Sequence, residues 1–175
     1  MMARKFMIYL ITIIMLSAGC VSTQYQMNNK QKELAQSLAG LTDDYLATAK
    51  NVGIIGFGGK VFCTHKTLDI EETEQGINEY LYVYCQEYYL TDGYLKMGTG
   101  RSLPVVLSLQ KENQTYKAVG HKTPRDGSQS SHDVETLFPA RTHKEIEAIT
   151  GALPAFWREE LEKKASNYFQ KPVER

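Results

Sequence analysis

The spacing of apolar positions predicts a helix at the start of the folded region. From residue 31 to residue 51 the apolar residues recur in steps of four, three, four and four, which places them on one face of a helix. They are Leu34, Leu38, Leu41, Tyr45 and Ala49. This face is narrow, so we expect a helix that packs on another layer, with a sheet as its partner.

A glycine-rich segment, 53–59 (GIIGFGG), comes next. A phosphate-binding loop follows a strand and opens a helix. This segment has the reverse order, and no Walker lysine with its Ser or Thr comes after it. We therefore interpret it as a helix stop and a flexible lead into a strand.

Two strand-like segments, 60–70 and 77–90, flank the polar loop EETEQG and predict a hairpin. A hairpin centred on Glu74 places Glu71 opposite Ile77 and Cys63 opposite Cys85. Cross-strand Cβ atoms lie about 4.5–5.5 Å apart, a separation that a disulfide can close. The register therefore predicts a Cys63–Cys85 disulfide, with free thiols or a metal-binding pair as alternatives.

The second of these strands carries the stretch EYLYVYCQEYYL at 79–90, which we expect to be the central strand. Alternation places Tyr80, Tyr82 and Tyr84 on one face of it. Two interpretations follow. The tyrosines form a binding platform for a ligand or partner, or they are scaffold that packs under the N-terminal helix with their hydroxyls at the rim.

Shorter strands continue the pattern. Asp92-Gly93 suits the centre of a tight hairpin turn. Strands are expected at 94–98, 103–109 and 115–121, and the glycine-rich 98–102 between the first two is a bulge or an exposed loop. Pro104 fits a strand start or an edge, because it cannot donate a backbone hydrogen bond. Short strands in sequence predict an antiparallel meander.

Helical signals return after residue 124. Ser130 or Ser131 caps a short helix to Phe138, and Thr142 with Glu145 fits a capping box for a helix to Ile149. A last helix opens at Pro154, with one apolar face formed by Trp157, Leu161, Ala165 and Tyr168. The fold class is therefore α+β: an N-terminal helix packed on a four- to five-stranded antiparallel meander sheet, with C-terminal helices. This arrangement resembles cystatin-like architecture, which does not fix a function.

The N-terminus has the pattern of a leader. The cations Arg4 and Lys5 precede an apolar run of 11 residues, 6–16, which is too short for a membrane span of about 20 residues. The run ends in LSAGC (16–20), which resembles the lipobox of bacterial lipoproteins. The resemblance implies that Gly19 is the last leader residue and that Cys20 carries the lipid. Ser17 departs from the usual leucine, and an ordinary secretory signal with a chance cysteine is the alternative.

The leader determines the expected domain organisation and localisation. We expect a signal peptide at 1–19, the lipidated cysteine and a flexible tether at 20–30, and a single domain at 31–175. Val21 is not the aspartate of an inner-membrane retention signal, so the outer membrane, facing the periplasm, is favoured. The lipid bilayer, held through acylated Cys20, is the first expected partner. Export to an oxidising compartment also favours the disulfide between Cys63 and Cys85.

Charge excludes one class of partner. The chain has 20 Lys and Arg against 20 Asp and Glu, and no basic stripe interrupts this balance. Nucleic acid is therefore not expected as a partner. An envelope protein or a small ligand remains as a partner.

A second resemblance lies in the middle of the chain. The segments PVVL (104–107) and PRDGS (124–128), with Asp133, Phe138 and Pro139, resemble parts of small extracytoplasmic bacterial domains of unknown function. This resemblance implies a shared fold element but indicates no biochemical activity. The candidate binding surface therefore comprises the three tyrosines and, in the loops at 98–102 and 124–132, Arg101, Arg125 and Asp126.

Candidate chemistry is sparse. The four histidines lack HExxH spacing, and a Cys63, His65 and Cys85 metal set competes with the disulfide for both thiols. A small hydrolase or metal-binding protein that uses His121, His132 and Asp133 is the alternative function, although no nucleophile with a base is identifiable. We expect no cofactor and no metal. The favoured function is a membrane-tethered, non-catalytic binding or interaction lipoprotein of the bacterial envelope.

Overall fold

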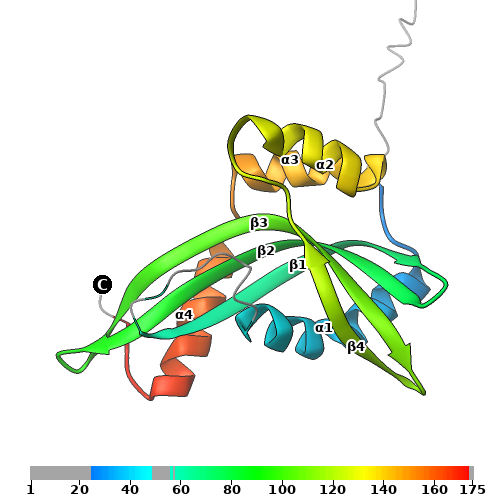
Figure 1. Cartoon of the computed structure of the whole chain (residues 1–175). Helices are drawn as coiled ribbons and strands as arrows, with labels where there is room; N and C mark the ends of the chain where they lie inside the picture. The colour runs from blue at the N-terminus through cyan, green and yellow to red at the C-terminus, as the bar shows by residue number, and fades with distance from the viewer. Residues whose placement is uncertain (1–24, 49–55, 57, 174–175) are drawn as a thin grey trace, which may run out of the picture.

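The computed structural model describes residues 25–48, 56 and 58–173. In this part of the chain one helix precedes a four-stranded sheet, and three helices follow it (Figure 1). The strands are sequential and antiparallel, in the order β1-β2-β3-β4, so the predicted α+β meander is confirmed. The elements are α1 Asn29–Thr48, β1 Lys60–Glu72, β2 Gly76–Thr91, β3 Tyr94–Glu112, β4 Thr115–Lys122, α2 Ser130–Leu137, α3 His143–Gly151 and α4 Ala155–Phe169, with short 3₁₀ turns η2 Gly127–Gln129 and η3 Ala140–Thr142.

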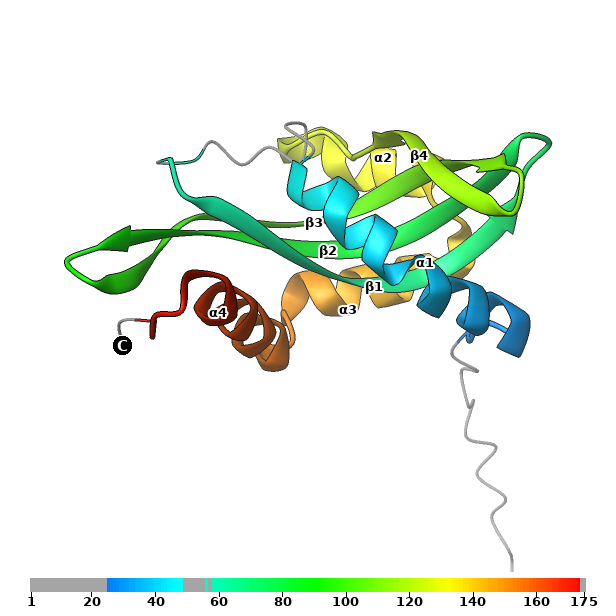
Figure 2. The ribbon, with the colours of Figure 1, turned by 90° about the horizontal axis from the view of Figure 1, so that it is seen from below.

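The helices lie on both faces of the sheet. Figure 1 shows α2 and α3 on one side and α1 on the other, and Figure 2 shows α1 crossing the strands obliquely. The β2–β3 hairpin reaches beyond the rest of the sheet in both views. Its turn is the one that the sequence predicts, because Asp92 and Gly93 both have positive φ, 51° and 83°.

The strands expected at 94–98 and 103–109 are one strand, β3. Gln86 pairs with Gly100 and Tyr88 pairs with Met97, so Gly98 and Thr99 together lie opposite Glu87. This is a β-bulge, in which two residues face one. The exposed-loop interpretation of 98–102 is therefore wrong, and the bulge interpretation is confirmed.

Pro104 also lies inside this long strand. Pairing of β3 with β4 begins only at Val106, so at Pro104 the strand has a neighbour on the β2 side alone. The proline is tolerated because this stretch of β3 is locally an edge.

The disulfide between Cys63 and Cys85 is present, and their Cα atoms are 4.1 Å apart. The two residues are directly opposed, as the hairpin register predicts. Nearer the loop the prediction is off by one residue: Glu71 pairs with Asn78, not Ile77. A bulge between Thr67 and Asp69 absorbs the difference, so the register is correct at the cysteines and displaced at the turn.

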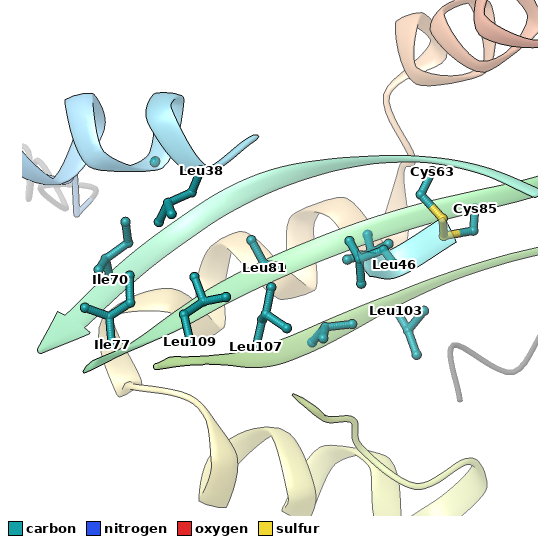
Figure 3. Packing of buried hydrophobic residues seen from close by; sticks show 13 residues of the cluster. Leu38, Leu46, Cys63, Ile70, Ile77, Leu81, Cys85, Leu103, Leu107 and Leu109 are labelled. Carbon is teal, nitrogen blue, oxygen red and sulfur yellow. A yellow bond between two sulfur atoms is a disulfide. The ribbon is translucent and has the colours of Figure 1, made fainter. Parts of the chain in front are cut away.

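One hydrophobic core lies between α1 and the sheet. Figure 3 shows its side chains, with the disulfide at one end. The buried face of α1 is rotated from the predicted one: Ala35, Leu38, Thr42 and Leu46 are buried, whereas Leu34, Leu41 and Tyr45 are half-buried. Thr42 can be buried because its hydroxyl donates a hydrogen bond to the carboxylate of Glu79 on β2. The buried cluster comprises Ala35, Leu38, Leu46, Cys63, Ile70, Ile77, Leu81, Val83, Cys85, Leu103, Val105, Leu107 and Leu109.

A second core lies on the opposite face, under the C-terminal helices. The even-numbered tyrosines of β2 fill it, so they do not pack under the N-terminal helix as the scaffold interpretation expected. The Tyr80 ring lies 5.9 Å from that of Phe138, and the Tyr82 ring 6.2 Å from that of Trp157. The other buried members are Leu68, Tyr84, Tyr88, Leu95, Val106, Ile146, Ile149, Leu161 and Ala165.

The C-terminal helices follow the predicted order with two differences. Thr142 does not cap α3 with its side chain; its hydroxyl donates to the Pro139 carbonyl at 2.8 Å, so the capping box is not formed. Tyr168 is 60% exposed and leaves the apolar face of α4 to Trp157, Leu161 and Ala165.

Candidate functional site

The tyrosines of the proposed binding platform are inside the protein. Tyr80, Tyr82 and Tyr84 are 6%, 2% and 8% exposed. The Tyr80 hydroxyl donates to Glu71 at 2.8 Å, and burial together with this carboxylate raises the pKa of Tyr80 to about 12. Rings covered by helices cannot offer a contact surface, so the platform interpretation is corrected: these residues are scaffold.

The other three residues of the candidate surface are held in ion pairs. Arg101 donates to Asp126 at 2.7 Å, which ties the PRDGS turn to β3. Arg125 contacts both carboxylate oxygens of Asp133 at 2.7 Å, and its backbone N–H donates to the same group at 2.9 Å. These bonds hold the pKa of Asp133 well below its ordinary value. The turn is therefore fixed by its own charges, although the side chains of Arg125 and Asp126 remain largely exposed.

The structure does not bring His121, His132 and Asp133 together. His121 lies on the α1 face, where the Tyr45 hydroxyl is 3.1 Å from its Nδ1. His132 is exposed on α2, which covers the opposite face. Asp133 is engaged by Arg125, and no three His, Cys, Asp or Glu side chains converge on a common point among the described residues.

The cysteine and histidine pair on β1 also lacks an open ligand set. Both thiols are consumed by the disulfide, and His65 Nδ1 lies 2.8 Å from the Asp43 carboxylate of α1. Lys164 of α4 reaches the same carboxylate at 2.7 Å. Burial would raise the pKa of Asp43, but the bonds to His65 and Lys164 outweigh it and lower the pKa.

A buried carboxylate lies beneath α1. Glu79 of β2 has no exposed surface and accepts hydrogen bonds from the hydroxyls of Thr42, at 2.8 Å, and Thr67, at 2.9 Å. Burial raises the pKa of Glu79. This contact explains why a threonine occupies the buried face of the helix, since its hydroxyl meets an acceptor that the chain places 37 residues away.

The glycine-rich segment surrounds a second buried carboxylate, that of Glu87. The Gly59 N–H donates to Glu87 Oε1 at 2.7 Å, and the Thr99 N–H lies 3.4 Å from Oε2. A Cβ at Gly56, Gly59 or Gly98 would lie within 3 Å of a carboxylate oxygen. In its described part, the segment therefore packs against a side chain of the protein itself. Residues 53–55 and 57 of this segment lie outside the described residues.

A polar hub at the edge of β1 was not anticipated from the sequence. The Asp69 carboxylate is fully buried and accepts bonds from the Tyr25 hydroxyl at 2.7 Å, from Gln31 at 3.0 Å and from Arg141 at 2.5 Å. Arg141 also contacts Glu71 and lies over the Tyr25 ring at 5.3 Å. One buried acid thus joins Tyr25 of the N-terminal segment, α1, the edge strand β1 and the turn η3.

A groove of about 640 Å³ opens beside this hub. Its apolar part consists of Met27, Leu68, Ala140 and Ala148. Its rim carries four cations, Lys32, Lys66, Arg141 and Lys144, with Glu145 as the acid among the lining residues. An open, amphipathic groove with a basic rim suits an anionic or amphiphilic ligand better than it suits bond-making chemistry.

The folded part of the chain begins earlier than the expected boundary at residue 31. Met27 packs against the α1 core and Tyr25 bonds to Asp69, and both line the groove. The sequence signal for this site is weak. Asp69 lies in the strand-like segment TLDIE, and Arg141 lies just ahead of the second C-terminal helix. Nothing in the sequence shows that these two residues, 72 positions apart, meet.

Comparisons with protein-family models, with curated proteins and with solved structures find no match. In the ranges that the structure describes, no helix is both long enough and apolar enough to cross a membrane. The functional conclusion therefore rests on the sequence signals and on the groove.

Proposed function

We propose that this chain is a lipid-anchored, non-catalytic binding lipoprotein of the bacterial cell envelope. The leader, the LSAGC motif and the cysteine at position 20 support the anchor. Two or more acyl chains on such a cysteine hold a protein stably, whereas one chain alone is marginal. The proposed site of residence is the outer membrane, facing the periplasm.

The groove beside Asp69 is the observation that carries the binding role. It lies where the chain enters the domain, since Tyr25 and Met27 form part of its lining. Its walls come from the N-terminal segment, α1, β1 and α3, which the buried Asp69 hub holds together. A site fixed by buried hydrogen bonds on regular elements keeps its shape without a ligand, and such preorganisation favours binding.

Metabolic labelling with radioactive palmitate tests the anchor. Full-length protein expressed in bacteria should incorporate label and partition with the membrane fraction, and Cys20→Ala should incorporate no label. The matched control is the double variant Cys63→Ala/Cys85→Ala, which removes the other two cysteines and should keep the label. Equal labelling of Cys20→Ala and wild type would remove the lipoprotein assignment.

A further inference from the structure

We propose that the groove beside Asp69 binds the phosphate group of an anionic ligand, supplied by the headgroup of a membrane phospholipid or by a soluble phosphate compound. This inference deepens the proposed function and, for the lipid source, rests on it. The observation behind it is a pair of lysines that line the groove from two different helices, Lys32 on α1 and Lys144 on α3.

The four cations of the rim are not equivalent. Arg141 is committed to Asp69 and Glu71, and Lys66 lies 2.5 Å from Glu145. The ammonium groups of Lys32 and Lys144 have no ion-pair or hydrogen-bond partner within the described residues. Two uncompensated cations that face one groove attract an anion, and a phosphate, with several oxygens, can contact both.

The apolar part of the groove narrows the ligand class. Met27 and Leu68 come from the N-terminal segment and from the bulge of β1, and Ala140 and Ala148 come from the α3 side. Met27, Ala140 and Ala148 offer most of this apolar contact, because Leu68 is only 6% exposed. A glycerophospholipid headgroup has this combination of a charged phosphate and an adjoining apolar part, whereas a purely ionic ligand would leave the apolar wall unused.

The position of the groove along the chain brings it close to the proposed anchor. Tyr25, in its lining, is five residues after Cys20. Even fully extended, five residues reach at most about 18 Å. An acylated Cys20 would therefore hold the groove near the layer of lipid headgroups, where lysines are attracted to anionic lipids over distances set by a Debye length of about 8–10 Å.

Hydrogen–deuterium exchange of the full-length mature protein in nanodiscs tests the proposal. Three conditions are compared: phosphatidylcholine alone, phosphatidylcholine with phosphatidylglycerol, and phosphatidylcholine with added inorganic phosphate. We expect slower exchange at 66–68 and 140–148 with phosphatidylglycerol. The Lys32→Gln/Lys144→Gln variant should lose this protection. The control Lys111→Gln/Lys122→Gln removes two exposed lysines elsewhere and should keep it.

The outcomes separate the two sources and the two proposals. Protection by inorganic phosphate alone assigns the site to a soluble phosphate compound, and protection only by phosphatidylglycerol assigns it to lipid. No protection in any condition, or equal loss in both lysine variants, overturns the phosphate site. The phosphate titration can be repeated on the full chain with Cys20→Ala in solution, so a failed anchor does not hide a working groove.

Discussion

The Lys164 ammonium lies 2.7 Å from the Asp43 carboxylate, although α4 and α1 pack against opposite faces of the sheet. It also donates to the Cys63 carbonyl at 2.8 Å, on the edge strand β1. One side chain therefore joins both helical layers around the edge. The same contact occupies a backbone acceptor that an edge strand otherwise leaves open to another chain.

The variant Asp43→Asn should lower the free energy of unfolding by about 1 kcal/mol at pH 7, because it weakens the bonds to Lys164 and His65 in a half-buried site. The pKa of Asp43 is lowered on folding, so its contribution is present above its unfolded pKa of about 3.8 and is lost as the pH falls through the folded value. The pKa of Lys164 is raised, so its contribution is lost only as the pH rises past 10.5. Urea titrations of the wild type, of Asp43→Asn, of Lys164→Met and of the double variant Asp43→Asn/Lys164→Met measure the coupling energy between the two side chains. Strict additivity would show that the pair does not join the layers.

Glu79→Gln should respond to pH in the opposite sense. The pKa of Glu79 is raised by burial above its ordinary 4.5, so the wild type loses stability as the pH rises through the folded value. The glutamine variant has no charge to bury and escapes this loss. We expect its stability relative to wild type to be higher at pH 8 than at pH 4, as measured by urea unfolding at both. A constant difference would mean that Glu79 is not buried in its charged form.

Gly98→Ala should destabilise the fold by about 1–3 kcal/mol through overpacking. Its Cβ would lie 2.3 Å from Glu87 Oε2, and Glu87 is held by the Gly59 N–H and cannot easily withdraw. Gly120→Ala on β4 is the matched control, because a Cβ there meets nothing within 4 Å. The control should be neutral or slightly stabilising. Thermal unfolding measures the stability of both variants. An equal loss of stability in Gly98→Ala and Gly120→Ala would contradict the bulge geometry.

Removal of the disulfide should cost about 2–4 kcal/mol, because the bond restricts a loop of 22 residues in the unfolded chain. Cys63→Ala/Cys85→Ala should accordingly melt about 5–15 °C below wild type. Wild type treated with reductant should approach the same temperature. A variant that melts at the same temperature as the oxidised wild type would contradict a stabilising role for this disulfide.

Much of the fold could be predicted from local patterns, and the failures have identifiable causes. The Cys63–Cys85 register depends only on strand alternation and a polar loop, so it could be predicted. The position of Glu71 opposite Asn78 could not, because the bulge at Leu68 leaves no signal in the apolar pattern. The glycines of 98–102 predicted an interruption of the strand, and they fitted an exposed loop and a bulge equally well. The choice depends on Glu87, which needs small residues opposite it.

The candidate site was harder to predict than the fold. Tyrosines at alternate positions identify a face of a strand but not which helices cover it, and the C-terminal helices that bury them are 50 or more residues further along the chain. The Asp69 hub joins residues 25, 31, 69 and 141, whose meeting depends on tertiary packing alone. A polar residue in an apolar segment indicates a partner, but its sequence position does not identify that partner.

Mass spectrometry of the mature N-terminus decides whether Cys20 carries the proposed lipid anchor. Full-length protein would be expressed in bacteria, extracted from the membrane fraction with detergent and digested. We expect an N-terminal peptide that begins at Cys20, with acyl chains on its thiol-linked glyceride, and we expect no such peptide from Cys20→Ala. A mature chain that begins at any other residue, or an unmodified Cys20, would contradict it.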